Sequence, residues 1–237
     1  MRTLAVFFTF LFLLTALAKP CYATEFFERL PQFSRIEISG RIIVQIEGPG
    51  DTIVTNTANS MRINVRRGDI RDIDFFMSGE TLVLRKNSRG FHTRNITITL
   101  NISNTISQLD VSTGALVRAQ RNIFDERAEI RAESGSFLEL FVDTYALFIN
   151  CGRDSSIILR GRVDQLEARA VNSGLVNAES LAAARVHVHA FTGSTIRVNA
   201  TEYLEATAGM RSFVYYKQGP AIKHLSEFAG GTYIEFQ

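Results

Sequence analysis

The chain has 237 residues, of which 46% are hydrophobic, 21% charged and 10% aromatic, with 16 Gly and 4 Pro. This apolar content excludes a disordered or low-complexity chain and is enough for one sizeable core or two small ones. The formal net charge of +2 argues against a strongly basic nucleic-acid binder, and the 2 Cys are too few for a disulfide framework or a structural zinc cluster.

The first segment has the features of a secretory signal peptide. Arg2 precedes an apolar run at 4–17, and a small-residue exit ends at Ala23. This run is shorter than the roughly 20 residues that a membrane helix needs, so a retained anchor is the weaker alternative. We expect residues 1–23 to be a signal peptide cleaved after Ala23, and residues 24–32 to be a linker.

Cleavage after Ala23 would also change the cysteine content of the exported chain. It removes Cys21 and leaves Cys151 alone, so an internal disulfide cannot form. Export without disulfides fits a bacterial periplasm or cell surface better than an animal extracellular space. The apolar neighbours Phe148 and Ile149 predict that Cys151 is a buried, unreactive thiol.

Alternation of apolar and polar residues predicts β-strands after the signal segment. Ile36 and Ile38 flank Glu37, and the same alternation recurs at 82–84 and 96–102. A period of two is typical of a strand with one buried face and one face in water. The mature chain is therefore expected to be all-β.

An internal repeat appears in the second half of the chain. A glycine closes a short strand at intervals of about 20 residues, which is the repeat length of a solenoid. These expected corner glycines are Gly114, Gly135, Gly152, Gly174, Gly193, Gly209 and Gly230. Glycine suits a corner because it adopts positive φ at little cost. Two strands of four or five residues cannot bury an apolar face alone, so successive units must stack on one another.

The repeat predicts a single β-solenoid domain at 33–237, built from coils of roughly 20 residues. We expect a strand-rich part at 33–108 and the glycine-corner repeats at 109–237. An antiparallel β-sandwich also needs many short strands and is the alternative fold. The segment 179–185 has helical propensity and is interpreted as a short connector.

Four stretches of the sequence are similar to stretches of one known family. They are the opening at 33–46, the strand motifs Gly79-Glu-Thr-Leu-Val-Leu and Ile96-Thr-Ile-Thr-Leu, and the ending at 214–234. Together with the serial Ser/Thr-Gly corners, they resemble the GIN domain, the head domain of auto-transporter adhesins. The resemblance covers 33–236 and implies a right-handed parallel β-helix in an exported bacterial protein. It supplies no catalytic residues.

His187 and His189 are the strongest candidates for metal ligands. Two His at i and i+2 share one face of a strand, where they can hold a metal together. Val188 lies between them and is expected to point inward, which directs both imidazoles to water. A third ligand is not evident in the sequence, although Glu205 or Arg169 would be near on adjacent coils. We therefore expect no metal and no cofactor, with these two His as a weak alternative.

Carboxylates are the second kind of candidate, because many β-helix proteins cleave polysaccharides. The candidates are Asp125, Glu126, Asp143, Asp154 and Asp164. Glycoside hydrolysis needs two carboxylates about 5–9 Å apart, and adjacent coils can bring such pairs together. Because several of these acids have arginine neighbours, they are also typical of a charge-balanced surface. We predict that the protein is not an enzyme.

These observations favour an exported, non-enzymatic β-solenoid that acts as an adhesion, scaffold or envelope-interaction module. The expected partner is a surface glycan, an envelope component or another protein, and not nucleic acid. The expected location is the periplasm or the surface of a bacterium, without a transmembrane segment in the mature chain. A polysaccharide-active enzyme on a β-helix and a periplasmic ligand- or metal-binding protein are the alternatives.

Overall fold

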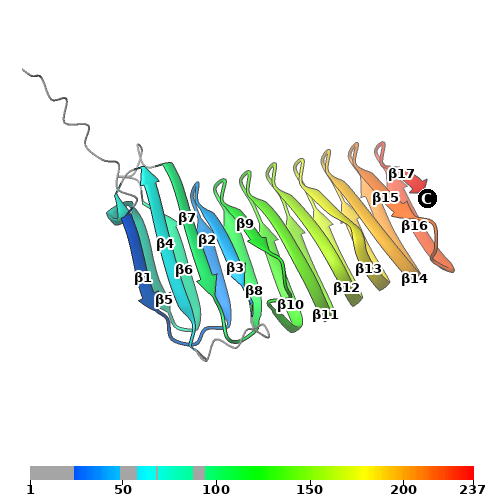
Figure 1. Ribbon diagram of the computed structural model, residues 1–237. Coiled ribbons are helices and arrows are strands. Elements are labelled where there is room, and N and C mark those ends of the chain that lie inside the picture. The colour runs from blue at the N-terminus through cyan, green and yellow to red at the C-terminus, as the bar shows by residue number, and fades with distance from the viewer. Residues whose placement is uncertain (1–23, 49–57, 68, 88–93) are drawn as a thin grey trace, which may run out of the picture.

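The computed structural model describes residues 24–48, 58–67, 69–87 and 94–237, and the predicted signal peptide at 1–23 lies outside them. These residues form an elongated β-solenoid of about seven turns (Figure 1), which confirms the predicted fold class. In chain order the strands are β1 (Thr24–Arg29), β2 (Arg35–Ser39), β3 (Ile43–Glu47), β4 (Ser60–Arg67), β5 (Ile73–Ser78), β6 (Thr81–Lys86), β7 (Arg94–Asn101), β8 (Ile106–Ser112), β9 (Leu116–Ala119), β10 (Phe124–Ala132), β11 (Phe137–Cys151), β12 (Ser156–Ala170), β13 (Leu175–Ala190), β14 (Thr195–Gly209), β15 (Phe213–Lys217), β16 (Ile222–Phe228) and β17 (Thr232–Phe236). A 3₁₀ turn, η1 (Ile70–Asp72), precedes β5, and the described residues contain no helix long and apolar enough to cross a membrane.

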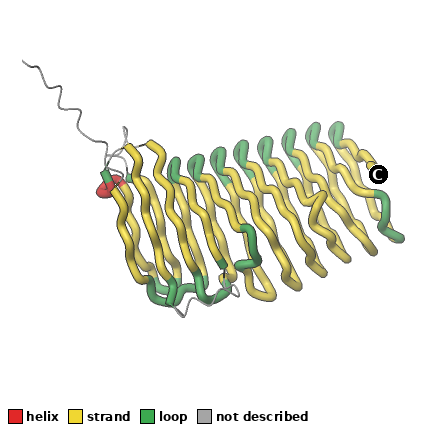
Figure 2. Tube along the Cα trace, in the orientation of Figure 1, coloured by secondary structure: helices red, strands yellow, loops and turns green. Residues whose placement is uncertain are grey.

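The strands build two opposing sheets. One sheet runs β1–β4–β7–β3–β9–β11–β12–β13–β14–β15–β17. The other runs β5–β6–β2–β8–β10–β11–β12–β13–β14–β16. Strands β11 to β14 belong to both sheets, because each is 15 or 16 residues long and bends midway. Tight turns connect successive strands along the long edge opposite these bends (Figure 2).

Pairing is parallel throughout the repeats and partly antiparallel near the N-terminus. Strands β8 to β17 pair only in parallel within the described chain, which excludes the antiparallel sandwich there. The antiparallel pairs are β1–β4, β4–β7 and β5–β6. At this end the rings of Phe26 and Phe75 meet across the core with centroids 5.4 Å apart. The antiparallel strands thus close the N-terminal end of the solenoid. The segment 24–32, expected to be a linker, contains β1, which pairs with β4 along its whole length and so belongs to the sheet.

The core lies between the two sheets and consists of ladders of apolar side chains. Leu138, Ile157, Val176, Ile196 and Val214 occupy one register position in five successive strands. All five are 0% exposed. Fully burying a side chain of this size stabilises the fold by about 1.5–3 kcal/mol, so stacked coils gain what an isolated coil cannot.

Each tight turn in the repeats contains two consecutive residues with positive φ. The pairs are Thr113–Gly114, Ser134–Gly135, Arg153–Asp154, Asn172–Ser173, Thr192–Gly193, Met210–Arg211 and Ala229–Gly230. Glycine therefore takes the second position in four turns, whereas Asp154, Ser173 and Arg211 take it in the others. Asp and Ser in turns can hydrogen-bond to nearby backbone, which helps offset the strain of this conformation.

The expectation that all seven corner glycines supply positive φ is wrong for three of them. Gly152, Gly174 and Gly209 flank the turns and do not have positive φ. Packing explains two of these glycines instead. A Cβ on Gly174 would lie 2.5 Å from the carbonyl oxygen of Cys151, and one on Gly209 would lie 2.5 Å from the Phe228 ring.

The residue after each turn pair is small, because it enters the edge of the core. These residues are Ala115, Ser136, Ser155, Gly174, Ser194, Ser212 and Gly231. The buried hydroxyls are satisfied by backbone: Ser194 Oγ donates to Ala170 O at 2.9 Å and Ser212 Oγ donates to Ala190 O at 2.6 Å. Small residues at this position let successive turns stack closely.

The segment 179–185 is not a connector of helical character. It lies inside β13, where the register with β14 shifts between Ala178 and Ala182. Pairing on both sides by β12 and β14 overrides its helical propensity, since tertiary contacts commonly outweigh this weak preference.

Candidate binding site

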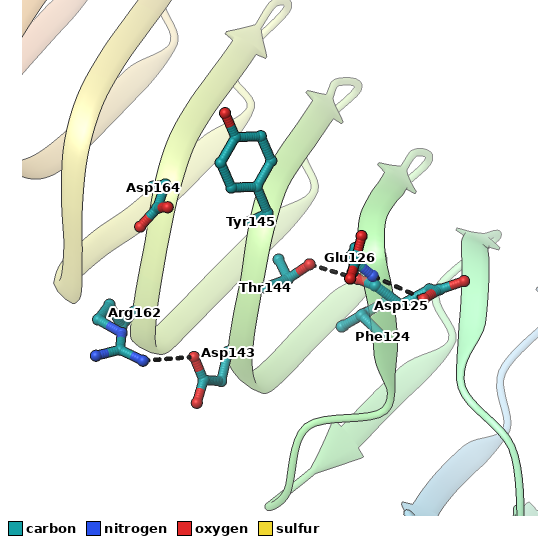
Figure 3. Close-up of a pocket in the computed structure, with 8 residues that line it drawn as sticks. All are labelled: Phe124, Asp125, Glu126, Asp143, Thr144, Tyr145, Arg162 and Asp164. Atoms are coloured by element: carbon teal, nitrogen blue, oxygen red, sulfur yellow. Dashed lines mark hydrogen bonds and ion pairs between the residues drawn. The ribbon is translucent and has the colours of Figure 1, made fainter.

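A pocket of about 410 Å³ opens where β11 and β12 bend from one sheet to the other. We call it the corner pocket. Its lining residues come from β10, β11 and β12 and are Phe124, Asp125, Glu126, Asp143, Thr144, Tyr145, Arg162 and Asp164 (Figure 3). Three successive strands therefore contribute side chains to one concave surface.

The side chain of Asn122 ties the segment before β10 to β11 and so shapes the pocket. Its Nδ2 donates to Phe124 O at 3.0 Å and to Asp143 O at 2.9 Å, and its Oδ1 accepts from Asp143 N at 3.2 Å. Thr144 Oγ1 donates to Asp125 O. Phe124 is 2% exposed and anchors this segment in the core. The pocket is thus built on fixed backbone.

The charges of the corner pocket are unbalanced. Four carboxylates, from Asp125, Glu126, Asp143 and Asp164, share the lining with the guanidinium of Arg162. Arg162 Nη2 lies 3.4 Å from Asp143 Oδ1, and Figure 3 shows the two side chains facing each other. Their side chains are 74% and 55% exposed, so this ion pair contributes little to stability. The remaining acceptors face solvent and carry excess negative charge.

Tyr145 adds an aromatic face to the pocket. The residue is 44% exposed, and its hydroxyl accepts a hydrogen bond from Gln165 Nε2 at 3.1 Å, which fixes the ring from the next strand. An exposed, oriented ring beside carboxylate acceptors can pack on apolar C–H groups while the acceptors bind hydroxyl or amine donors. This combination suits a polar ligand that has both kinds of surface.

The structure brings together four of the five carboxylates selected from the sequence. Asp125, Glu126, Asp143 and Asp164 line the corner pocket, whereas Asp154 lies in a tight turn with φ of 60°. Sequence reasoning missed Thr144, Tyr145 and Arg162. The repeat spacing could have located them, because residues about 19 apart lie side by side on neighbouring coils, as Asp143 and Arg162 do.

His187 lies in a surface cluster on β13, β14 and β16. Its Nδ1 is 3.2 Å from Glu205 Oε2, and Tyr203 Oη donates to the same carboxylate at 3.0 Å. The Tyr203 ring lies between His187 and His224, with centroids 5.4 and 5.7 Å away. The hydrogen bond from Tyr203, supported by His187, lowers the pKa of Glu205.

The structure places His189 apart from this cluster. Its ring stacks on Phe191 with centroids 6.3 Å apart, and its register neighbour on β12 is Arg169. Val188 between the two His is 0% exposed, as its inward orientation predicts. Across the ranges given above, no group of three His, Cys, Asp or Glu is placed to hold a metal ion. His187 and His189 therefore do not converge on one site.

Cys151 is buried, as its apolar neighbours predict. Burial raises the pKa of its thiol to about 12. Its Sγ donates to Ser155 O at 3.3 Å. A protonated, buried thiol is a poor nucleophile, so Cys151 is a core residue.

The fold and the pocket define an all-β solenoid with a polar pocket at one edge. The family described as "Putative auto-transporter adhesin, head GIN domain" matches residues 32–220. Since this is most of the chain, the protein belongs to that family.

Solved structures of Bacteroides and Parabacteroides proteins have the same fold. A protein described as a putative adhesin from Bacteroides fragilis aligns with a TM-score of 0.78 and 17% identity, covering 91% of this chain and 97% of that chain. A second putative adhesin, from Parabacteroides merdae, aligns with a TM-score of 0.72 and 16% identity, covering 91% of this chain and 96% of that chain. A protein described as a putative lipid binding protein from Parabacteroides distasonis aligns with a TM-score of 0.65 and 16% identity, covering 91% of this chain and 97% of that chain. At these identities the likeness shows the fold alone. No curated protein matches the chain.

Proposed function

We propose that the protein is an exported, non-enzymatic adhesion module that binds a surface glycan through the corner pocket. The observation that carries the proposal is the convergence of an exposed aromatic ring and polar side chains from three successive strands. Family membership supports the adhesion role, because the family is described by adhesin heads.

The chemistry of the pocket selects among glycans. Carboxylates of Asp125, Asp143 and Asp164 accept hydrogen bonds from sugar hydroxyls, and the Tyr145 ring packs on the apolar face of a sugar. The excess of carboxylates over the Arg162 guanidinium disfavours acidic sugars by repulsion. A neutral glycan, or one that carries free amino groups, is the proposed ligand.

Export is part of the same proposal. Residues 1–23 would direct the chain out of the cytoplasm, with cleavage after Ala23. The mature chain would reach the bacterial surface or the periplasm, and adhesion requires the surface. Folding there needs no disulfide, because Cys151 is the single remaining cysteine and lies in the core.

The test is a glycan array probed with residues 24–237, followed by affinity measurements on any glycan that binds. Tyr145→Ala and Asp143→Ala are each expected to weaken binding at least about tenfold, which corresponds to ~1.4 kcal/mol. Asp154→Ala is the matched control, because it removes an exposed carboxylate outside the pocket, and its affinity should be unchanged. Absence of glycan binding by the wild-type chain, or equal binding by all variants, would contradict the proposal.

A polysaccharide-active enzyme is the second candidate, because four carboxylates converge in the corner pocket. A glycosidase needs one carboxylic acid kept protonated by a shielded environment while the other stays ionised. Here Asp125, Glu126, Asp143 and Asp164 are all exposed, which favours binding over catalysis. A reducing-sugar assay on glycans from the array decides between the two. Turnover that Asp143→Asn or Asp164→Asn abolishes would establish the enzyme.

A further inference from the structure

The C-terminal end of the solenoid exposes an unusual amount of apolar surface. Its large hydrophobic side chains that are exposed by more than a third are Met210 (53%), Phe213 (38%), Ile222 (52%), Leu225 (38%), Phe228 (48%) and Ile234 (37%). All seven residues of β16 are exposed. At the other end of the solenoid, Phe26 and Phe75 cover the core. Concentrated apolar surface of this kind marks an interaction site.

The same end presents two open strand edges. Strand β16 pairs with β14 on one side and β17 pairs with β15 on one side, and no described strand lies beyond either. An open edge offers unpaired backbone N–H and C=O groups to another strand. The last coil thus combines exposed apolar side chains with a template for pairing.

Charged residues at inward positions restrict which strand can pair here. Lys223 is in register with buried Leu204, and Glu235 is in register with buried Tyr216. Lys223 Nζ lies 3.4 Å from Glu235 Oε2, so these two residues face each other across the end of the core. A strand without charges of its own would take this ion pair out of water and give it no further charged partner, which is costly.

We propose that this end binds a second copy of the chain, so that two solenoids join end to end. A two-fold axis that runs between the two sheets and parallel to the strands exchanges one sheet for the other. It places β16 antiparallel beside β17 of the second copy, and β17 beside β16. Because Lys223 faces Glu235 within one copy, this axis sets Lys223 beside Glu235 of the other copy. Each charge then meets an opposite charge.

The register fixed by this charge pair also suits most of the other side chains. Ile222 faces Phe236, Leu225 faces Tyr233, and Ser226 faces Thr232 of the second copy, whereas His224 faces Ile234. A shift of two residues in one direction sets Leu225 against Glu235 and leaves Lys223 without an opposite charge. Cross-strand matching of this kind specifies one register.

End-to-end pairing has a consequence for adhesion that does not depend on which ligand is bound. The joined solenoid carries two corner pockets at a fixed separation. Two pockets that bind neighbouring units of a repeated polymer strengthen attachment through effective concentration, without any new contact. The dimer itself needs no ligand, so its test is independent of the glycan proposal.

A charge-exchange experiment on residues 24–237 tests the dimer. Sedimentation velocity and light scattering are expected to give twice the chain mass for the wild type. Lys223→Glu and Glu235→Lys each oppose like charges at the junction and should weaken dimerisation at least about tenfold. An equal mixture of these two variants should form heterodimers, because each Glu then meets a Lys of the other chain. The double variant K223E/E235K should dimerise again.

A second pair of variants guards against local misfolding of the charge variants. Ile222→Lys places a charge in the apolar junction and should give a monomer, whereas Phe148→Lys, on the flank and 42% exposed, should leave the dimer intact. Circular dichroism melts confirm that each variant is folded. A wild-type chain that stays monomeric at millimolar concentration overturns the proposal. So does an equal mixture of folded Lys223→Glu and Glu235→Lys that forms no heterodimer.

Discussion

Gly161 lies at the bend of β12, and its replacement by alanine tests how the coil turns from one sheet to the other. Its φ is 119°, and a Cβ added there would lie 2.0 Å from the carbonyl oxygen of Val142. That is more than 1 Å inside a C···O contact of about 3.3 Å. Since the obstructing atom is backbone on the paired strand β11, a change of side-chain rotamer cannot relieve the clash.

The expected destabilisation has two parts. The backbone conformation costs an L-residue about 1–3 kcal/mol. Separating β11 from β12 at Val142 weakens one or two backbone hydrogen bonds, each with a net contribution of about 0.5–1.5 kcal/mol. The sum is about 3 kcal/mol, which corresponds to a Tm lower by ~6–12 °C for a chain of this size.

Gly193→Ala is the matched control for Gly161→Ala. Gly193 has a φ of 69°, and a Cβ there would meet nothing within 4 Å. The alanine at this position pays only for the left-handed backbone conformation. Its free energy of unfolding should fall by about 1–2 kcal/mol, which lowers Tm by ~2–8 °C. Thermal and urea unfolding followed by circular dichroism measure both variants. A Gly161→Ala chain as stable as the Gly193→Ala chain would refute the steric explanation of the bend.

Two further predictions concern buried titratable groups. Asp110 Oδ1 is buried without a hydrogen-bond partner, and burial is the main cause of the raised pKa of this carboxyl. A folded-state pKa above the unfolded value means that stability falls as pH rises above the ordinary carboxyl value of about 3.9. Asp110→Asn should therefore have a higher Tm than wild type at pH 7, and this difference should disappear below about pH 3.9. An equal Tm difference at both pH values would contradict a raised pKa for Asp110. Cys151, with a thiol pKa of about 12, should react with a disulfide reagent at pH 8 at least about 100-fold more slowly in the folded chain than in urea, so rapid labelling of the folded chain would show that it is accessible.

The solenoid is predictable from the sequence because its coils repeat the same physical unit. The alternation of apolar and polar residues, and a turn about every 20 residues, can both be recognised in the sequence. The exact turn positions are not, because Arg153–Asp154 and Met210–Arg211 take positive φ without glycine. Gly174 and Gly209 lie outside the turn pairs for another reason, which is close packing: a Cβ on Gly174 would meet the backbone carbonyl of Cys151, and one on Gly209 would meet the Phe228 ring.

The sequence predicts only some of the residues that line the corner pocket. Its carboxylates are chemically conspicuous, so Asp125, Asp143 and Asp164 stand out as candidates. Their convergence depends on coil register, which sets Asp143 beside Arg162, and on the bend that turns these side chains to one side. Tyr145 is hard to predict because an aromatic residue in a strand usually packs in a core, whereas this ring lies on the outer face of β11 and is 44% exposed.

Protease treatment of intact bacterial cells that express the full chain tests the adhesion role most directly. Immunoblots of intact cells are compared with cells whose outer membrane has been opened by osmotic shock, and a periplasmic marker confirms that the intact cells stayed closed. Cleavage of the solenoid on intact cells is the predicted result. Protection until the outer membrane is opened would place the chain in the periplasm and contradict an adhesin.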